Sequence, residues 1–156
     1  MSLAFRHTAG FGKRIEYWII GSMLKEGLDV YMPLVDDFGV DAVIRRNDGS
    51  FIEVQIKARS STVIMGNAAL FAAIVHEVRP NYYFVFYSER MDKMWIMSSK
   101  EFVAESTQNV AGNNVGKRGI WFNGTKINKE TKERHEYPNP KFDKYVKNNF
   151  DIFKII

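Results

Sequence analysis

Hydrophobic residues first recur at helical spacing over residues 11–26, "FGKRIEYWIIGSMLKE". The apolar positions of this stretch fall on one stripe of a helix and are Phe11, Ile15, Trp18, Ile19 and Met23. Gly27 follows directly, and glycine commonly follows the last turn of a helix. The pattern therefore predicts an amphipathic helix that buries one face and ends before Gly27.

After this helix, the helical spacing gives way to shorter apolar runs that are rich in β-branched and aromatic residues. Several of these runs alternate with polar residues. They predict strands over residues 28–33, 40–45, 51–57, 82–87 and 93–97, and a further short strand over 119–122. Residues 108–119 are rich in Asn and Gly and are expected to form a loop. Residues 123–140 are polar, and we expect them to be a mobile connection.

Three further helices are expected. Asn67 is a suitable N-cap for an alanine-rich helix over 67–78, and Ser98 or Ser99 for a short helix through Glu105. Residues 141–150 have the pattern of a final amphipathic helix. Strands interleaved with helices predict an α/β fold in which a central mixed β-sheet is flanked by helices.

The chain has 156 residues, which is the size of one ordinary domain. We expect a single domain over 1–156, with a core over about 11–98 and a basic C-terminal extension over about 117–156. No apolar run approaches the ~20 residues that span a bilayer, so no membrane contact is expected. The chain has no cysteine, which excludes thiolate metal sites and cysteine nucleophiles and fits a cytoplasmic location.

The net charge of +4 is unevenly distributed. Residues 117–156 contain 10 Lys and Arg against 5 Asp and Glu, whereas residues 1–116 contain 12 against 13. A basic segment suits contact with a phosphate backbone, although a solvated surface would have the same composition. The candidate nucleic-acid contacts in this segment are Lys117, Arg118, Lys141, Lys144 and Lys147.

The stretch 39–58, "GVDAVIRRNDGSFIEVQIKA", reads as a β-hairpin around an Asn-Asp-Gly turn. A two-residue loop would place Asp41 opposite Ile56, whereas a three-residue loop over 47–49 would place it opposite Gln55. The apolar pattern favours the three-residue loop, because it aligns the apolar residues of both strands on one dry face. That face contains Val40, Ala42, Ile44, Val54 and Ile56, and the opposite face then gathers Asp41, Gln55 and Lys57.

A carboxylate and an amide oxygen are hard ligands, suited to Mg²⁺ or Mn²⁺ rather than to zinc. A lysine beside such a metal ion can orient an attacking water or offset charge that develops on a phosphate. These are the components of metal-assisted phosphodiester hydrolysis, and the expected roles are metal binding for Asp41 and Gln55 and catalysis for Lys57.

The arrangement resembles the PD-(D/E)XK nuclease superfamily, whose signature is a helix glutamate, a strand aspartate and (D/E)-X-K on the next strand. Glu16 matches the helix glutamate, Asp41 the aspartate, and Gln55 and Lys57, in "QIK", the third motif. The resemblance covers about the first 90 residues. It implies a restriction-endonuclease-like core in the order α-β-β-β-α-β and a Mg²⁺- or Mn²⁺-dependent nuclease, acting on DNA rather than RNA. A homodimer is one expected assembly, and Glu16 is expected to complete the site through a metal-bound water.

The sequence departs from the superfamily pattern at two positions. Val40 stands where the pattern has proline, and Gln55 replaces an acidic residue, although some members of the superfamily use glutamine there. Glu53, or Asp36 and Asp37, could supply the missing negative charge.

Other functions remain open. The chain could be a non-catalytic nucleic-acid-binding or interaction module on the same fold, or an assembly subunit that buries apolar residues such as the terminal "FKII". Singly, Asp41 could bond to the backbone and Lys57 could extend to water. His76 is expected to be a structural or surface residue, and Trp18 and Trp95 to be core residues. Trp121 is expected to pack in the core or at an edge rather than to stack on a base.

Overall fold

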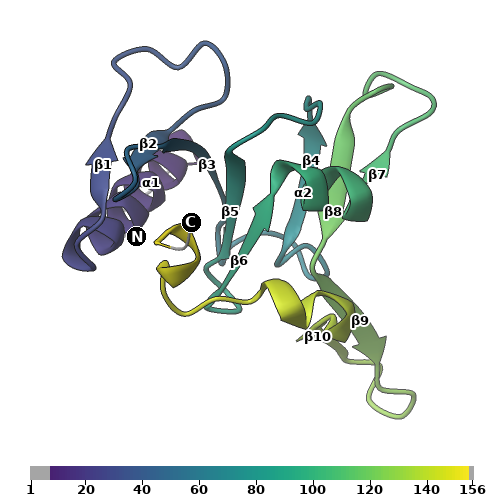
Figure 1. Ribbon diagram of the computed structural model, residues 1–156. Helices are drawn as coiled ribbons and strands as arrows, with labels where there is room; N and C mark the ends of the chain where they lie inside the picture. The colour runs from purple at the N-terminus through teal and green to yellow at the C-terminus, as the bar shows by residue number, and fades with distance from the viewer. Residues whose placement is uncertain (1–7, 155–156) are drawn as a thin grey trace.

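The computed structural model describes residues 8–154 (Figure 1). Its helical elements are α1 (Thr8–Lys25), α2 (Ser99–Glu105) and the 3-10 helices η1 (Pro140–Tyr145) and η2 (Asp151–Phe153). Its strands are β1 (Asp29–Tyr31), β2 (Ala42–Arg45), β3 (Phe51–Arg59), β4 (Leu70–Ile74), β5 (Tyr82–Ser88), β6 (Lys93–Ser98), β7 (Thr107–Gln108), β8 (Arg118–Trp121), β9 (Asn123–Ile127) and β10 (Arg134–Pro138).

The central sheet has the strand order β1-β2-β3-β5-β6. β3 and β5 pair in parallel, and every other neighbouring pair in this sheet is antiparallel. This confirms the predicted mixed sheet. None of the helices in the described part of the chain is long and apolar enough to cross a membrane.

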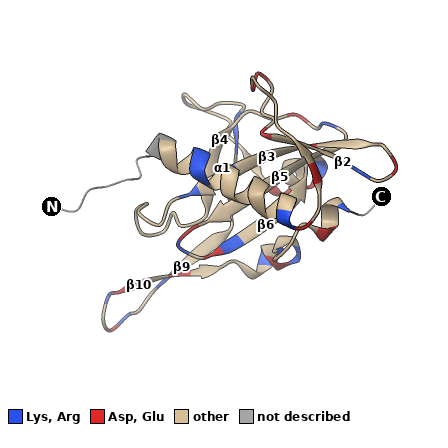
Figure 2. Cartoon of the chain, turned by 90° about the vertical axis from the view of Figure 1, so that its left-hand side faces the viewer, with Lys and Arg blue, Asp and Glu red and all other residues tan. Residues whose placement is uncertain are grey.

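Helix α1 covers one face of the central sheet, and it lies in front of the sheet in Figure 2. The predicted apolar stripe is buried here, with Ile19 and Met23 packed in one cluster with Ile44 and Val85. Trp18 is the exception, because its side chain is 53% exposed and meets the ring of Tyr87 edge-on at 5.0 Å. The prediction that Trp18 is a core residue is therefore wrong.

The other face of the central sheet packs against a second layer, formed by α2, η1 and a three-stranded sheet in the order β4-β8-β7. Aromatic rings fill the space between the layers. Phe84 lies 4.4 Å from Phe102, and Trp95 stacks on Phe122 at 4.6 Å between ring centroids. Trp95 is 1% exposed, which confirms its predicted place in the core.

The expected helix over 67–78 is wrong, since this segment contains strand β4. β4 pairs antiparallel with β8, and its Phe71 and Ile74 are buried in the second cluster. Ala73 has a positive φ of 58°, which interrupts regular structure within the strand. Partners distant in sequence thus override the local helical preference of the alanines.

The expected helix over 141–150 is also wrong, because η1 ends at Tyr145. The chain then runs alongside β6, where Val146 forms an antiparallel bridge with Trp95 and the Lys147 N–H donates to the Met94 carbonyl at 2.9 Å. The short helix through Glu105 is confirmed as α2. Ser98 is its N-cap, and its hydroxyl accepts a hydrogen bond from the Glu101 N–H at 3.1 Å.

Residues 123–138 were expected to form part of a mobile connection, and they form the hairpin β9–β10 instead. The hairpin extends away from the rest of the molecule in both views (Figures 1 and 2). The polar composition of this segment therefore belongs to an ordered, solvent-exposed ribbon.

Candidate functional site

The β2–β3 turn has the predicted three-residue form. The Arg46 N–H donates to the Ser50 carbonyl at 2.8 Å, and Gly49 has a positive φ of 85°. The ladder then runs from Arg45 opposite Phe51 to Ala42 opposite Val54. The predicted register is confirmed over this segment.

Asp41 lies one residue before β2, at the open edge of β3. Its N–H donates to the Val54 carbonyl at 2.9 Å, and its carboxylate Oδ2 accepts the Ile56 N–H at 2.7 Å. Beyond the end of β2, the Ile56 N–H of β3 has no main-chain partner on that strand, and the Asp41 carboxylate takes its place. Val40 departs from the expected face, because it packs with the second cluster rather than with Ala42 and Ile44.

The surroundings of Asp41 disfavour its charged form. Burial raises the pKa of Asp41 to about 6, and the hydrogen bond from Ile56 opposes that shift. The negative charges of Glu16 and Asp36 raise the pKa further, whereas Lys13 lowers it. Negative charge is therefore concentrated at this edge of the sheet.

Glu16 reaches the same region from α1. Its side chain is 20% exposed, and Oε2 accepts a hydrogen bond from Lys13 Nζ at 2.9 Å. The effect of Glu16 on the pKa of Asp41 shows that the two carboxylates interact. Glu16 thus lies within electrostatic range of Asp41, and the site that these two carboxylates would form stays a prediction.

Gln55 is held by a buried tyrosine. The single hydroxyl hydrogen of Tyr82 is shared between the Gly39 carbonyl and Gln55 Oε1, and the hydroxyl lies 3.0 Å from Gln55 Oε1. Burial raises the pKa of Tyr82 above its ordinary value, so this hydroxyl remains a donor. A Cβ at Gly39, where φ is +70°, would lie 3.1 Å from Gln55 Nε2, so a side chain there would disturb the amide.

Arg79 fixes the surroundings of Tyr82. Its Nη2 forms an ion pair with Glu53 Oε2 at 2.6 Å, its Nη1 donates to the Phe38 carbonyl at 2.8 Å, and its guanidinium lies 4.5 Å from the Tyr82 ring centroid. Glu53 is therefore paired with a cation and is poorly placed to supply the missing charge. No sequence pattern pointed to the roles of Tyr82 and Arg79, because Tyr82 begins an apolar strand and Arg79 precedes it in a connecting segment.

A cleft of about 480 Å³ opens next to Gln55 and Tyr82, between the loop at 37–39 and the segment 75–79. His76 lies in its wall, and its Nε2 is 2.6 Å from the Ser99 hydroxyl. Burial and then the positive charges of Arg79 and Arg118 lower the pKa of His76 to about 4, so the ring is neutral at physiological pH. This confirms the structural role expected for His76.

Lys57 lies two residues after Gln55, on the same face of β3, and is half-buried. Among residues 8–154, no group of three or more His, Asp or Glu side chains is arranged to hold a metal ion. A metal site here would therefore depend on the Gln55 amide and on water as well as on Asp41 and Glu16. Such a mixed set of oxygen ligands suits Mg²⁺ or Mn²⁺, which retain several waters.

The five predicted nucleic-acid contacts lie in different parts of the molecule. Arg118 is directed inward, since its Nη1 donates to the Val103 carbonyl at 3.2 Å and approaches the Ser106 hydroxyl at 3.4 Å. Lys141 and Lys144 are exposed on η1, and Lys117 directly precedes β8.

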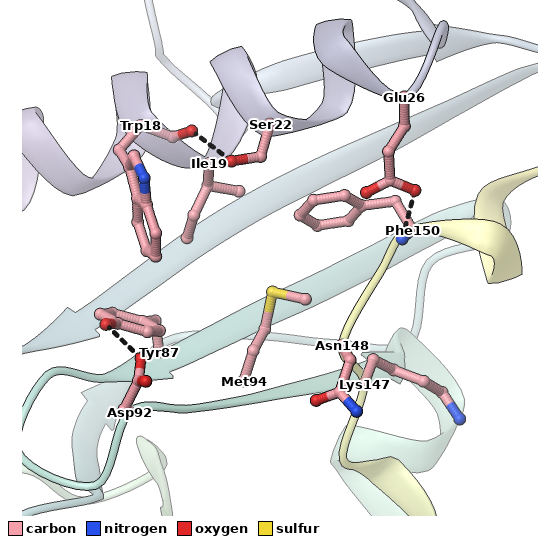
Figure 3. A pocket seen from close by; sticks show the side chains of 10 residues that line it. All are labelled: Trp18, Ile19, Ser22, Glu26, Tyr87, Asp92, Met94, Lys147, Asn148 and Phe150. Atoms are coloured by element: carbon pink, nitrogen blue, oxygen red, sulfur yellow. Dashed lines mark hydrogen bonds between the residues drawn. The ribbon is translucent and has the colours of Figure 1, made fainter.

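Lys147 lines a different pocket, of about 260 Å³, on the α1 side of the sheet (Figure 3). Trp18, Tyr87 and Met94 are among its other lining residues. The Tyr87 hydroxyl donates to Asp92 Oδ1 at 3.1 Å, and the Glu26 carboxylate accepts the Phe150 N–H at 3.0 Å. Structural contacts thus already engage several polar groups of this pocket.

The fold is similar to that of the bacterial homing endonuclease I-Ssp6803I. The two structures superpose with a TM-score of 0.59 over 94% of this chain and 92% of that chain, with 17% sequence identity. The likeness shows a nuclease-like fold. No known family model matches the sequence, and no curated protein matches it.

Proposed function

We propose that the protein is a metal-dependent endonuclease that hydrolyses phosphodiester bonds in DNA, as a PD-(D/E)XK variant with glutamine in the third motif. The observation that carries the proposal is the placement of Asp41. Its carboxylate is held against the backbone of the Gln-Ile-Lys segment, under the negative charge of Glu16. A structural carboxylate gains nothing from such repulsion, whereas a bound cation would relieve it.

The ligands for Mg²⁺ or Mn²⁺ in this proposal are Asp41, Gln55 and, through a water, Glu16. The Asp41 Oδ1 atom has no hydrogen-bond donor within residues 8–154, so it is free to bind a cation. Gln55 Oε1 has one lone pair left beyond its bond from Tyr82. The metal supplies Lewis-acid stabilisation and an activated water when it is bound.

Lys57 is the proposed catalytic cation. Its ammonium group orients the attacking water or stabilises the charge that develops on the phosphate. Tyr82 keeps the Gln55 amide oriented, and Arg79 holds the wall of the adjoining cleft. We further propose that the chain acts as one nuclease-like domain.

The experiment is cleavage of plasmid DNA with Mg²⁺ or Mn²⁺ by wild type, Asp41→Asn and Lys57→Ala. We expect metal-dependent cleavage by wild type and a loss in both variants, with Mn²⁺ binding reduced only in Asp41→Asn. Identical traces of residual cleavage in all three proteins would indicate a contaminating nuclease and would contradict the proposal.

A non-catalytic DNA-binding module on the same fold is the second candidate. The observation in its favour is that Glu53, the acidic residue nearest to Gln55 in sequence, is already paired with Arg79. Under this reading, wild type binds DNA without cleaving it under any metal condition. The cleavage assay therefore separates the two candidates.

The homodimer also remains a proposal. The loop before β2 supports it, because Leu34, Val35 and Phe38 are 103%, 70% and 78% exposed, which is unusual for three apolar side chains so close together. Analytical ultracentrifugation of wild type and a Leu34→Ser/Phe38→Ser variant tests this point. A monomeric wild type would exclude it.

A further inference from the structure

The β9–β10 ribbon stands apart from the other strands. It is a two-stranded antiparallel sheet, and neither strand pairs with another strand in residues 8–154. Both views show it at the opposite end of the molecule from β2 (Figures 1 and 2). An isolated hairpin is marginally stable in water, so its order must come from contacts at its ends.

The base of the ribbon is anchored by buried polar groups. Asn123 is 4% exposed, and its side chain accepts the Ala69 N–H at 2.9 Å and donates to the Gly66 carbonyl at 3.0 Å. Across the ribbon, Glu136 forms an ion pair with Arg90 at 2.6 Å, with the carboxylate side chain 8% exposed. These contacts fix the direction in which the ribbon leaves the molecule.

The tip of the ribbon is also ordered. Asn128 Oδ1 accepts the N–H groups of Glu130 and Thr131 at 2.9 and 3.2 Å. The Asn128 N–H donates to the Glu133 carbonyl at 2.8 Å, and the Lys132 N–H donates to the Asn128 carbonyl at 2.8 Å. The tip is thus preorganised and would lose little conformational entropy on binding a partner.

The two faces of the ribbon differ. Glu136 and Asn123 lie on the face that bonds to the main chain at 66–69. Lys126 and His135 pair directly on the opposite face, which we call the outer face. The Lys126 ammonium lies 4.9 Å from the ring centroid of Tyr137 on this face, and the His135 side chain is 63% exposed. The outer face therefore presents hydrogen-bonding side chains to solvent.

The exposed part of the ribbon has a positive charge. Its exposed cations are Lys126, Lys129, Lys132 and Arg134, and its exposed anions are Glu130 and Glu133. Four positive and two negative charges give +2, since Glu136 is neutralised by Arg90. None of these cations was among the contacts predicted from the sequence, because 123–140 was expected to be a mobile connection.

We propose that the β9–β10 ribbon enters the major groove of duplex DNA, with Lys126 and His135 facing base edges and Lys129 and Lys132 contacting phosphates. The inference rests on the proposed function and deepens it. The major groove of B-form DNA is about 12 Å wide and admits a two-stranded ribbon, whereas that of A-form RNA is too narrow. Because the ribbon lies far from β2, these contacts extend the recognised site beyond the cleaved phosphate.

The electrostatic part is tested with Lys129→Ala/Lys132→Ala and a control pair, Lys25→Ala/Lys100→Ala, in which two exposed lysines elsewhere are removed. Binding to a fluorescent DNA duplex is measured in EDTA over a range of salt. We expect the ribbon pair to bind at least about tenfold more weakly, with a salt slope lower by about two, and the control pair to bind as wild type does.

The base-reading part is tested by selection from a randomised duplex library with wild type, Lys126→Ala and His135→Ala. We expect each variant to lose preference at a few adjacent positions and to keep the rest. Double-stranded RNA should displace bound DNA from wild type poorly. From Lys126→Ala and His135→Ala it should displace bound DNA as well as competing duplex DNA does. An unchanged selection profile, or strong competition by double-stranded RNA for wild type, overturns the major-groove assignment.

The outcomes separate this inference from the proposed function. Wild type that cleaves DNA while the ribbon pair binds like the control pair overturns the role of the ribbon and leaves the nuclease proposal intact. Wild type that binds no duplex overturns both. Weaker binding by the ribbon pair, with normal Mn²⁺ affinity, supports the ribbon as a DNA-contacting element separate from the metal site.

Discussion

The molecule contains two antiparallel hairpins in contrasting settings. The β2–β3 hairpin lies within the central sheet and packs its apolar face against α1, whereas β9–β10 extends into solvent. Charge in the first hairpin is costly, because burial opposes the ionisation of Asp41. Apart from Glu136 at the base of the ribbon, charge in the second hairpin is exposed and solvated. Under the two proposals, the same local structure serves catalysis where it is covered by a helix and DNA docking where it is exposed.

The largest difference is expected in catalysis. Asp41→Asn should lower the rate of cleavage by on the order of 100-fold or more, because it removes the carboxylate that would bind the metal. Lys129→Ala/Lys132→Ala should retain the wild-type rate at saturating DNA. Single-turnover kinetics measure both. A similar fall in the cleavage rate at saturating DNA for Asp41→Asn and Lys129→Ala/Lys132→Ala would contradict the assignment of catalysis to one hairpin and DNA binding to the other.

Metal affinity should change next most. Gln55→Glu adds a carboxylate that can still accept the Tyr82 hydroxyl, so Mn²⁺ should bind about tenfold more tightly, with cleavage retained or raised. Gln55→Ala should bind Mn²⁺ more weakly than wild type. Calorimetric titration compares the three, with Lys129→Ala as the control. Equal Mn²⁺ affinity of wild type, Gln55→Glu and Gln55→Ala would show that Gln55 does not bind the metal.

Two glycines give a matched pair of smaller effects. Gly39→Ala forces a side chain into positive φ and against Gln55, and should destabilise the protein by about 1–2 kcal/mol and reduce Mn²⁺ binding. Gly124→Ala places a Cβ 2.5 Å from the Tyr137 ring, which should move the Tyr137 side chain away from Lys126 and weaken DNA binding without changing Mn²⁺ affinity. Denaturant titration and both binding assays check these results, and a reversed pattern would contradict the assignment.

The smallest effect concerns stability against pH. The folded pKa of Asp41 is raised from 3.8 to about 6, so the folded state binds more protons between these values and stability falls as pH rises through them. Asp41→Asn keeps an acceptor for the Ile56 N–H and lacks this cost. Its melting temperature should be a few degrees above that of wild type at pH 7 and equal to that of wild type below pH 4. Equal melting curves at every pH would show that the ionisation of Asp41 is not penalised.

The sequence predicted the central features of the first hairpin. The Asn-Asp-Gly turn and the alternation of apolar residues were sufficient for the register, because both are local. The capture of the Ile56 N–H by Asp41 matches the simpler interpretation of Asp41 as a backbone partner, and its raised pKa was not visible without the packed neighbours.

The regions that sequence reasoning missed depend on distant partners. β4 forms because β8 lies beside it, and the ribbon is ordered because Asn123 and Glu136 bond to residues 66–69 and Arg90. Similarly, the orientation of Gln55 depends on Tyr82, which lies 27 positions away. No local pattern encodes these pairings, so propensity favoured a helix in one case and a mobile segment in the other.

The most direct test of the central claim is Mn²⁺ binding at pH 6, measured by calorimetry in buffers of different ionisation enthalpy, with wild type and Asp41→Asn. Because the pKa of Asp41 is about 6, wild type should bind Mn²⁺ and release about half a proton, and Asp41→Asn should bind far more weakly and release almost none. Equal affinity and equal proton release in the two proteins would show that Asp41 does not bind metal, and would contradict the nuclease account.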